Sequence, residues 1–564
     1  MKAEIEKSIK KALTKLYPSH KDVAFTVEYA PDNIDADFAS NVAMVLAKKV
    51  GKKPMDLAEE IAAEIAAVAV APGFVNISLD QKTLLNVLEE IVEQGDSYGE
   101  SQKKSAESVL VEYFQPNIAK PLHVGHMRSA IIGDSIYRLK KLFHKKVESD
   151  THMGDWGTQF GMLIARYKHL LDTESETAAK MLEDVGVAAT EYAKYSYAAE
   201  TQTEDEMREI AKQEFVKLEK GDEKNRKIWK QMVDTSMKEF LKINELLDIS
   251  EFDHHWPESF YEDKMPAVVE LLKEKGLLKE SQGAQVVDLE TYTLGTAIVI
   301  KSDGGTTYLL RDLATFLFRS EEQGFASQLY VVDVRQSHHF QQMFKILELL
   351  GKGIKSSVHL EFGFMKLPTG TLSTRKGNVV NLQEFVDEAE KRALEIINEK
   401  NPRLENKQTV SKQIALGAIK YADLKSNRKT DIVFDWDQAL SFEGNTGPYL
   451  QYTHARLKSI IRKAEIQLKI LGDIDISNHE RTLLSRLLMF GDIINDSVET
   501  FAPHILAEYL FRLAGEANSF YSKVPVLQEE DKKKKEFRIA LVLAVSQVLK
   551  NGLNLLGIEA PEEM

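Results

Sequence analysis

The sequence contains no cysteine among its 564 residues. Disulfide bonds and thiolate metal sites are therefore excluded, and with them a cysteine-ligated zinc ion. The chain also lacks a run of about 18 consecutive apolar residues, the length that a membrane-spanning helix needs. Its first residues, MKAEIEKSIKKALTKL, are amphipathic and charged, unlike a secretory signal sequence. We therefore expect a cytosolic (cytoplasmic) protein with no membrane contact.

Positive charge is scarce as well. Lysine and arginine number 73 against 87 aspartates and glutamates, a formal net charge of −14. This balance argues against nucleic acid covering much of the surface, and we expect no DNA partner. A local basic groove on an acidic body can still bind RNA. Hydrophobic residues make up 43% of the chain, enough for several cores.

Three regions with different patterns divide the chain. Residues 1–105 alternate short helical and strand-like patterns, which predicts an N-terminal α+β domain. Residues 106–440 place strand-like segments (SVLVEYF, AIVIKS, QLYVVDV and VHLEFGFM) between helical ones, which predicts an α/β domain with a doubly wound, Rossmann-like parallel sheet. Within it, residues 175–250 are helical and charged, as in an insertion. Residues 441–564 keep the 3.6-residue apolar period throughout and predict a C-terminal all-α helical bundle.

The most informative segment is VLVEYFQPNIAKPLHVGHMRSAIIGD, residues 109–134. It predicts a buried strand, a turn with His123, Gly125 and His126, and a helix. Ligands of open parallel sheets bind beyond the carboxyl ends of strands, and a helix N-terminus suits phosphate. We therefore predict a nucleotide site in which both imidazoles donate to phosphate oxygens and Gly125 lets the backbone approach an adenine. Two unrelated surface histidines are the alternative.

The stretch PNIAKPLHVGH closely resembles the signature of class I aminoacyl-tRNA synthetases in its arginyl form. HMGDWGTQFG, TYLLRDLAT, STRKGN, FEGNTGPYLQYTHAR and NGLNLLGIEAPEEM agree in the same order, so the resemblance covers the whole chain. It implies that the protein activates L-arginine with ATP, releases pyrophosphate, and transfers arginine to the 3′-terminal adenosine of its tRNA. It also implies attack by the 2′-hydroxyl, activation only with tRNA bound, and Mg²⁺ bound as part of the ATP complex. We expect a monomer.

Arginine is a permanently charged fork of donors, and a buried guanidinium without acceptors is costly. By resemblance, Tyr308 and Asp312 hold the guanidinium, and Glu112 and Asn117 hold the α-amino end. The full set of arginine-binding residues that the resemblance implies is Glu112, Asn117, His123, Tyr308, Asp312 and Gln336. Lysine is a point charge and would leave acceptors in such a site unpaired.

The second class I signature, usually Lys-Met-Ser-Lys-Ser, is altered here. The matching stretch is LSTRKG at 372–377, with Thr374 in place of the second lysine. The cation that neutralises the phosphates is therefore open, and Lys120 is favoured because the arginyl family often combines this substitution with such an upstream lysine. The predicted ATP-binding residues are His123, Gly125, His126, Ser373 and Lys376. The predicted catalytic residues are Lys120, His123, Gly125, His126, Arg375 and Lys376.

The helical region after residue 441 resembles the anticodon-binding domain of this family. Because RNA is read in unstacked loops by stacking on aromatic side chains, we predict tRNA contacts at Tyr449, Tyr452 and Arg456, with interdomain packing as the alternative. The N-terminal region resembles the family's additional domain, which contacts the corner of the tRNA. Phe38 and Asn41 are candidates there.

Two other functions stay open. A nucleotidyl transferase that activates a small acid would explain residues 109–134 but gives the helical region no role. A catalytically inactive tRNA-binding relative would explain the helical region, but the intact His123, Gly125, His126, Glu112 and Asp312 argue against it. A cysteinyl-tRNA synthetase would need a thiolate zinc site, which this chain cannot form.

Overall fold

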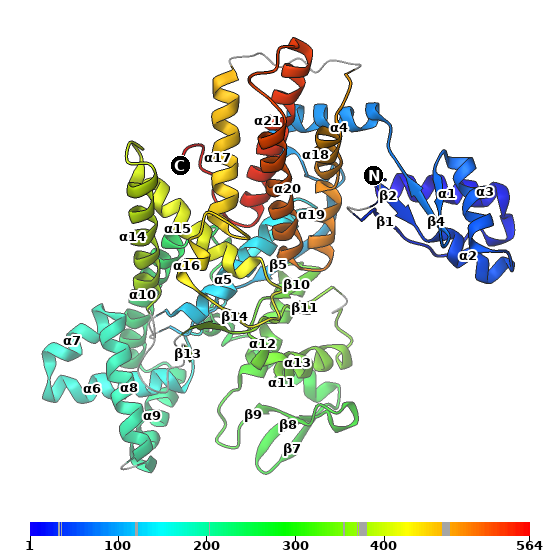
Figure 1. The fold of residues 1–564 in the computed structure, drawn as a ribbon. Helices are drawn as coiled ribbons and strands as arrows, with labels where there is room; N and C mark the ends of the chain where they lie inside the picture. Colours follow the sequence, from blue (N-terminus) through cyan, green and yellow to red (C-terminus); the bar gives the residue numbers. More distant parts are fainter. Residues whose placement is uncertain are drawn as a thin grey trace. The chain divides into compact units, whose positions relative to one another are not determined.

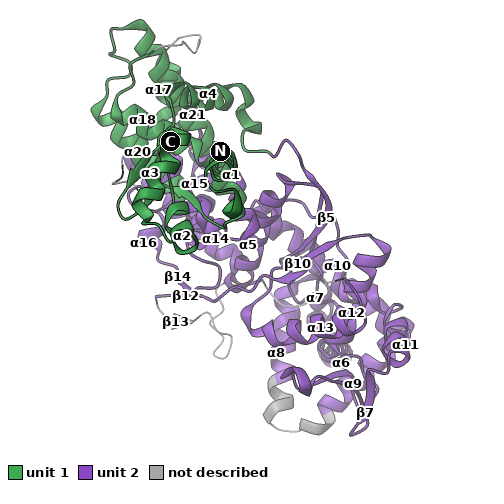
Figure 2. Ribbon diagram, turned by 90° about the vertical axis from the view of Figure 1, so that its right-hand side faces the viewer, with its two compact units in different colours: residues 1–100, 453–496, 509–552 green, residues 101–452, 497–508, 553–564 purple. Residues whose placement is uncertain are grey.

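The computed structural model describes residues 1–564 except 32–33, 35, 119–121, 202–203, 354–355, 369, 372–380 and 465–473. The side chains of 197–206 and 369–371 also lie outside the description. The chain forms two compact units (Figure 2). One unit comprises residues 1–100, 453–496 and 509–552, and the other comprises 101–452, 497–508 and 553–564. None of the helices in these described ranges has the length and apolar character needed to span a bilayer.

The N-terminal part of the first unit is an α+β domain, as predicted. Its four short strands form an antiparallel sheet in the order β1-β2-β4-β3. The strand-like segments FTVEYA and FVNISL contain β1 and β4. The elements are α1 (Lys2–Leu16), β1 (Val27–Tyr29), β2 (Phe38–Ser40), α2 (Val42–Val50), α3 (Pro54–Ile65), β3 (Val68–Val70), β4 (Phe74–Ile77) and α4 (Gln81–Gln94).

In the described residues after 441 the regular secondary structure is α-helical, which confirms the predicted all-α region. The helices are α17 (Gly447–Ala464), α18 (Asn478–Leu488), α19 (Phe490–Glu499), α20 (Pro503–Lys523) and α21 (Lys532–Leu555) (Figure 1). A buried carboxylate joins α18 to the N-terminal domain. Asp37 accepts hydrogen bonds from Arg481 at 2.6 Å and from Ser485 at 2.5 Å. These bonds help to make one compact unit from segments more than 400 residues apart.

The second unit is built on a four-stranded parallel sheet. It consists of β5 (Ser105–Glu112), β6 (His144–Asp150), β10 (Ser327–Tyr330) and β11 (Val358–His359), in the order β11-β10-β5-β6. The chain runs from β5 to β6 on one side and then crosses to β10 on the other side of β5. The order therefore reverses between β5 and β10, and a crevice at their carboxyl ends is where such sheets bind ligands. The predicted parallel sheet is confirmed.

Two strand assignments differ from the sequence prediction. AIVIKS forms β9 (Thr296–Ile300), which belongs to a separate antiparallel sheet with β7 (Leu278–Ser281) and β8 (Ala284–Asp288), so its place in the parallel sheet was predicted wrongly. Only alternate residues of β9 are buried, which is typical of a one-sided sheet. The edge strand β6 was missed because its sequence, HKKVESD, is mostly polar and buries only its second half.

VHLEFGFM contains two strands rather than one. β11 ends the parallel sheet, and β12 (Met365–Leu367) pairs with β13 (Gly370–Thr371) and β14 (Ile432–Val433) in a third sheet. Helices carry most of the remaining chain. They are α5 (Val124–Lys141), α6 (Thr158–Thr173), α7 (Ser175–Glu183), α8 (Val185–Thr201), α9 (Glu204–Glu219), α10 (Glu223–Leu246), α11 (Met265–Glu274), α12 (Tyr308–Leu317), α13 (Ser337–Leu349), α14 (Leu382–Lys400), α15 (Lys407–Leu424) and α16 (Trp436–Ala439).

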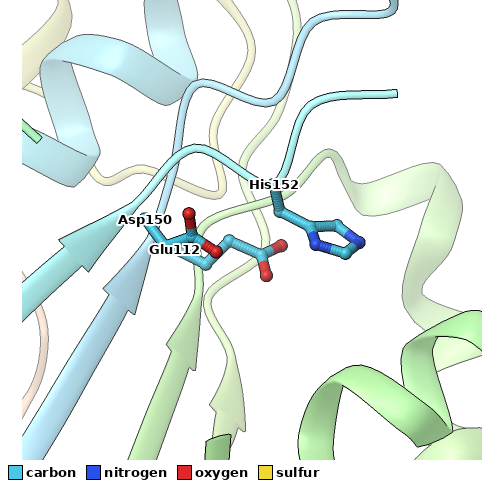
Figure 3. Close-up of side chains that lie close together, drawn as sticks. All are labelled: Glu112, Asp150 and His152. Atoms are coloured by element: carbon cyan, nitrogen blue, oxygen red, sulfur yellow. The ribbon is translucent and has the colours of Figure 1, made fainter. Parts of the chain in front are cut away.

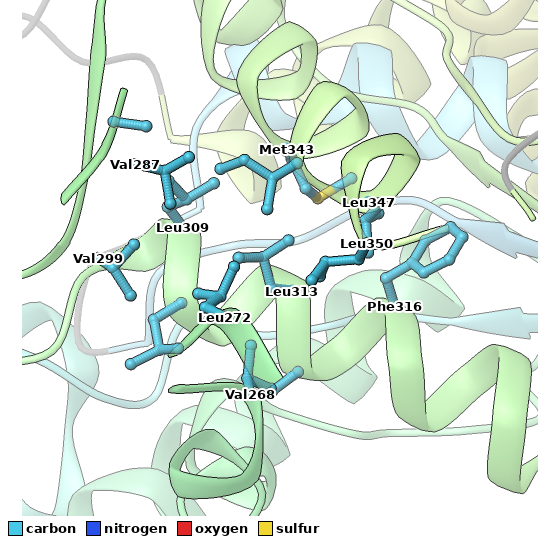
Figure 4. Close-up of a cluster of buried hydrophobic side chains, with 14 of the residues drawn as sticks. Val268, Leu272, Val287, Val299, Leu309, Leu313, Phe316, Met343, Leu347 and Leu350 are labelled. Carbon is cyan, nitrogen blue, oxygen red and sulfur yellow. The ribbon is translucent and has the colours of Figure 1, made fainter. Parts of the chain in front are cut away.

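A hydrophobic cluster fixes the helix that carries two of the predicted arginine ligands. Leu309, Leu313 and Phe316 recur at helical spacing along one face of α12, and each is at most 4% exposed. Side chains of α11, α13 and the β7-β8-β9 sheet pack against them (Figure 4). Burying this face sets the rotation of α12, so that Asp312 points away from the apolar core.

Candidate active site

A pocket of about 600 Å³ lies beyond the carboxyl ends of β5 and β10, at the point where the strand order reverses. Asn117, His123, Gly125, His126 and Gln336, five of the predicted site residues, line it. The other lining residues are Phe114, Gln115, Arg128, Ser129, Val332, Asp333, Arg335, Phe362, Gly363, Phe364, Met365 and Lys366. Its size suits a nucleotide or a comparable small molecule.

The two histidines cap the helix that opens at this pocket. His123 is the N-cap of α5, and its Nδ1 accepts a hydrogen bond from the Gly125 N–H at 3.1 Å. The Nδ1 of His126 accepts from the His123 N–H at 3.2 Å, and the two ring centroids lie 3.9 Å apart. Because each Nδ1 is an acceptor, the proton of each ring sits on Nε2. Both imidazoles are therefore set as Nε2–H donors beside the positive end of a helix.

Gly125 is required for a reason that the sequence did not reveal. A Cβ at this position would lie 2.8 Å from Cε1 and 2.9 Å from Nδ1 of the His123 ring. Any side chain here would displace that ring and break the capping bond. The glycine thus protects the position of a histidine, whereas the sequence suggested only a close approach to adenine.

Asn117 is placed by a similar close contact. It forms an isolated parallel bridge with Gly154, and a Cβ on Gly154 would lie 2.3 Å from Asn117 Oδ1. The Ile118 N–H donates to the Gly154 carbonyl at 3.0 Å. The turn after β5 is therefore held by the segment that follows β6, and the exposed side chain of Asn117 borders the pocket.

Next to the pocket, the ends of β5 and β6 bring together Glu112, Asp150 and His152 (Figure 3). One potential ligand atom from each lies within 4.8 Å of the others. The carboxylates are already bridged by a guanidinium, because the fully buried Arg319 donates to Glu112 through Nη1 and to Asp150 through Nη2. A cation in this place would be repelled by Arg319 and would have to break both ion pairs, so the trio does not fit a metal ion.

Asp312 faces this cluster from α12. Its carboxylate lies 2.5 Å from His339 Nε2 and 3.6 Å from His152 Nε2. Burial works to raise the pKa of Asp312, but the hydrogen bonds from His152 and His339 outweigh it and hold that pKa well below its usual range. Burial alone would lower the pKa of His152, whereas Glu112 and Asp312 together raise it to about 9. The structure therefore keeps Asp312 ionised beside protonated His152.

A second carboxyl pair extends the cluster. Burial raises the pKa of Glu258 to about 7 and that of Asp155 to about 6. Glu258 lies 3.4 Å from the guanidinium of Arg311, which in turn lies 4.8 Å from the ring centre of Tyr308. Tyr308, 55% exposed, is open to solvent. A buried carboxyl with a pKa near neutrality is typical of functional sites.

The nucleotide pocket and the acidic cluster share a wall. The Gln115 amide, which borders the pocket, donates to Glu112 at 3.2 Å. The Ser129 hydroxyl, on α5, donates to the Val331 carbonyl at 2.8 Å, and its oxygen lies 3.3 Å from Gln115 Oε1. A molecule bound at the histidines and a cation bound at Asp312 would thus be neighbours in one site.

Several predicted residues lie outside the described part of the chain. These are Lys120, Ser373, Arg375 and Lys376, so the identity of the phosphate-neutralising cation stays a prediction.

The predicted tRNA contacts Tyr449, Tyr452 and Arg456 lie on α17 at spacings of three and four, which places them on one helix face. Tyr452 is 43% exposed, and Arg456 lies over the ring of Tyr521 at 4.6 Å.

The two candidates for tRNA contact in the N-terminal domain, Phe38 and Asn41, have different surroundings. Phe38 is completely buried in β2, where its ring packs 4.8 Å from that of Tyr29, so its predicted tRNA contact was wrong. Aromatic composition alone could not separate a core ring from a stacking ring. Asn41 accepts a hydrogen bond from the Thr26 N–H at 2.9 Å, and its tRNA contact stays a prediction.

Sequence reasoning also missed Asp150, His152, Glu258, Arg319 and His339. His152 begins the HMGDWGTQFG stretch and His339 follows the strand QLYVVDV, so the position of each after a strand was a usable signal. Arg319 carried no signal, because a lone arginine in FLFRSEE reads as a surface residue.

Comparison with known proteins identifies the fold and the class of protein. A family model described as tRNA synthetases class I (R), catalytic domain, matches residues 87–436. Together with the parallel sheet and the histidine-capped helix at its switch point, this match defines a class I aminoacyl-tRNA synthetase. Models for the arginyl tRNA synthetase N terminal domain and the DALR anticodon binding domain match residues 3–79 and 450–564.

Relatives that match most or all of the chain show which family of class I synthetases it belongs to. An arginine–tRNA ligase of Fusobacterium nucleatum is 38% identical over 577 residues, which cover 100% of this chain and 99% of the relative. One from Clostridium kluyveri is 43% identical over 497 residues, 87% of each chain. The solved Thermus thermophilus arginyl-tRNA synthetase superposes with a TM-score of 0.83 at 26% identity and covers 100% of both chains. The chain belongs to the arginyl-tRNA synthetase family.

Proposed function

We propose that this chain is an arginine–tRNA ligase, which activates L-arginine with ATP and transfers it to the 3′-terminal adenosine of its tRNA. One observation carries the proposal. The histidine-capped pocket, suited to a triphosphate, adjoins an ionised carboxylate, Asp312, that suits a guanidinium. Family membership supports the same activity.

In the first step the arginine carboxylate attacks the α-phosphate of ATP in line, and the bond to pyrophosphate breaks. The products are arginyl-adenylate and pyrophosphate. No covalent enzyme intermediate is needed, so the protein contributes positioning and stabilisation of negative charge. His123 and His126 donate Nε2–H bonds to phosphate oxygens, and the N-terminus of α5 adds its positive potential. ATP would enter as its Mg²⁺ complex, and the ion would offset part of the negative charge on the phosphates.

The remaining phosphate charge needs a cationic side chain. Lys120 is our first candidate, because the second signature carries Thr374 where the class usually has lysine. Arg375 and Lys376 are the other candidates, and Ser373 completes the predicted ATP contacts. Lys120→Ala should then lower adenylate formation more than Lys376→Ala does.

Arginine is held at both ends in this proposal. Asp312 and Tyr308 accept the guanidinium, while Glu112 and Asn117 bind the α-amino end, with Gln336 and His123 completing the pocket. Lysine would leave acceptors unpaired, because its ammonium cannot match a planar fork. Citrulline has the shape of arginine without its charge, and would form no ion pair with the Asp312 carboxylate.

In the second step the 2′-hydroxyl of the terminal adenosine attacks the mixed anhydride and AMP leaves. Residues 441–564 bind the anticodon region in our proposal, with Tyr449, Tyr452 and Arg456 in contact with RNA, and residues 1–105 contact the corner of the tRNA. Residues 106–440 form the catalytic domain, with an insertion at 175–250. We expect a cytoplasmic monomer that binds no DNA.

A charging assay tests the proposal directly. Purified protein is incubated with ATP, Mg²⁺, bulk tRNA and each of the twenty amino acids in turn. We expect acylation with arginine only, and no ATP–pyrophosphate exchange with arginine unless tRNA is present. Charging with another amino acid would refute the specificity, and no charging would favour a tRNA-binding protein without catalysis.

A further inference from the structure

The buried side chain of Arg128 connects the helix that begins at the two histidines to other segments of the chain. It lies on α5 and is 1% exposed. Its Nε lies 3.0 Å from Asp423 Oδ1, and its Nη2 lies 2.9 Å from the same oxygen. The guanidinium also donates to three backbone carbonyls, those of Gly363 at 2.6 Å, Thr430 at 3.1 Å and Arg428 at 3.3 Å. One side chain therefore joins α5 to three separate segments of the chain.

The segments that Arg128 joins build the second wall of the nucleotide pocket. Residues 362–366 line the pocket together with the histidine-bearing end of α5. Behind that wall, residues 428–431 are packed so tightly that a Cβ on Gly363 would lie 2.8 Å from Asp431 Oδ1 and 2.9 Å from the Lys429 carbonyl. The Phe364 N–H donates to Asp431 at 2.8 Å, and β12 continues parallel to β14. The wall and its backing are thus packed together as one layer.

The same wall is continuous with the second signature. β12 pairs with β13, which ends at Thr371, directly before the LSTRKG stretch in the sequence. On the far side of that stretch, the Leu382 N–H donates to the Leu122 carbonyl at 3.2 Å, next to His123. Both flanks of residues 372–380 are therefore attached to the segment 122–128 that carries the histidines.

We infer that Arg128 is a positioning residue, which sets the separation between the histidine-bearing helix and the opposite wall of the nucleotide pocket. This inference rests on the proposed function. Arg128 is not a ligand itself, because its Nε, Nη1 and Nη2 atoms are all bonded to protein acceptors. A guanidinium suits this place because its planar fork reaches acceptors in several directions at once, which the single ammonium of lysine cannot do.

The consequence differs between the two chemical steps. In-line attack at the α-phosphate requires that both walls of the pocket hold the triphosphate in place. A displacement of the reacting groups by about 1 Å lowers the rate on the order of 100-fold. Transfer of arginine from the adenylate to tRNA no longer involves pyrophosphate. A change at Arg128 should therefore slow the first step far more than the second.

The test measures the two steps separately in the full-length protein. Formation of adenylate is followed by ATP–pyrophosphate exchange with a tRNA that lacks the terminal hydroxyls. Transfer is followed in a single turnover from added synthetic arginyl-adenylate to intact tRNA. The variants are Arg128→Lys and, because that change can weaken folding, the milder Asp423→Asn, which keeps an oxygen acceptor for Arg128. Arg138→Lys is the matched control, since Arg138 pairs with Asp134 at 2.8 Å on the same helix without lining the pocket.

We expect Arg128→Lys to slow exchange by about 10- to 100-fold and transfer by less than about threefold. Asp423→Asn should give the same selectivity with a smaller loss, and Arg138→Lys should leave both rates within about threefold of the parent. Equal slowing of both steps by Arg128→Lys and Asp423→Asn would assign Arg128 a purely structural role and overturn the inference. Unchanged exchange in both variants would overturn it as well. Absence of arginine charging in the parent protein would instead refute the proposed function.

Discussion

Replacing the carboxylate of Asp312 with an amide tests the recognition of arginine. Asp312→Asn keeps the shape of the side chain and one oxygen for the hydrogen bond from His339, 2.5 Å away in the parent. The new amide N–H groups then face the donor fork of the substrate, and the charge is lost. Removing one partner of a buried ion pair costs about 3–5 kcal/mol. Because the Asp312 side chain is 24% exposed, we take the lower end, about 3 kcal/mol, which raises the KM for arginine on the order of 100-fold.

The measurement is tRNA-dependent ATP–pyrophosphate exchange over a range of arginine concentrations. The KM for ATP should stay within about threefold, because Asp312 does not line the nucleotide pocket. Asp134→Asn is the matched control. It removes a carboxylate that is 1% exposed and bonds Arg138 and Ser250 on the same unit. An arginine KM that changes no more in Asp312→Asn than in this control would refute the assignment of Asp312 to the guanidinium.

Three further outcomes follow from the site. Gly125→Ala should lower the rate of exchange about 10- to 100-fold at saturating substrates, because the new Cβ displaces His123; a rate within twofold of the parent contradicts this role. Burial raises the pKa of Glu258 to about 7, so the Glu258 carboxyl is protonated at lower pH. Only the ionised carboxylate attracts the guanidinium of the substrate. The KM for arginine should therefore fall about 3- to 10-fold between pH 6 and 8, and Glu258→Gln should flatten that profile. Tyr452→Ala should raise the KM for tRNA about 3- to 10-fold with the KM for ATP unchanged, whereas an unaltered tRNA KM would leave this exposed ring without a role in RNA binding.

The sequence predicted the sheet, the helical C-terminal region and the histidine pocket because each has a local pattern. SVLVEYF followed by His-x-Gly-His is a strand, a turn and a helix start within 30 residues, and such neighbours in sequence remain neighbours in space. AIVIKS shows the limit. An apolar run of this kind occurs in parallel and in antiparallel strands. Its pairing with β8 makes this strand antiparallel, and that pairing depends on the fold.

The polar network around Asp312 depends on contacts that no local pattern contains. Arg319 is 207 residues from Glu112 and 169 from Asp150, yet it bonds both carboxylates. His339 reaches Asp312 from another helix, 27 residues away. Phe38 and Tyr452 illustrate the same limit for aromatic rings, since the first is core and the second is exposed. Burial is set by the whole fold, which no local stretch of sequence contains.

The guanidinium of Arg319 also sets the net charge that a ligand meets at this cluster. Glu112, Asp150 and Asp312 supply three negative charges, and Arg319 with protonated His152 supplies two positive ones. Among these five groups one unit of negative charge is left, and His339, whose pKa Asp312 raises despite its burial, shares the Asp312 carboxylate with the ligand. Redesign toward a neutral amino acid should therefore begin by neutralising Asp312 and leave Arg319 in place, since removing Arg319 would instead create a demand for a second cation.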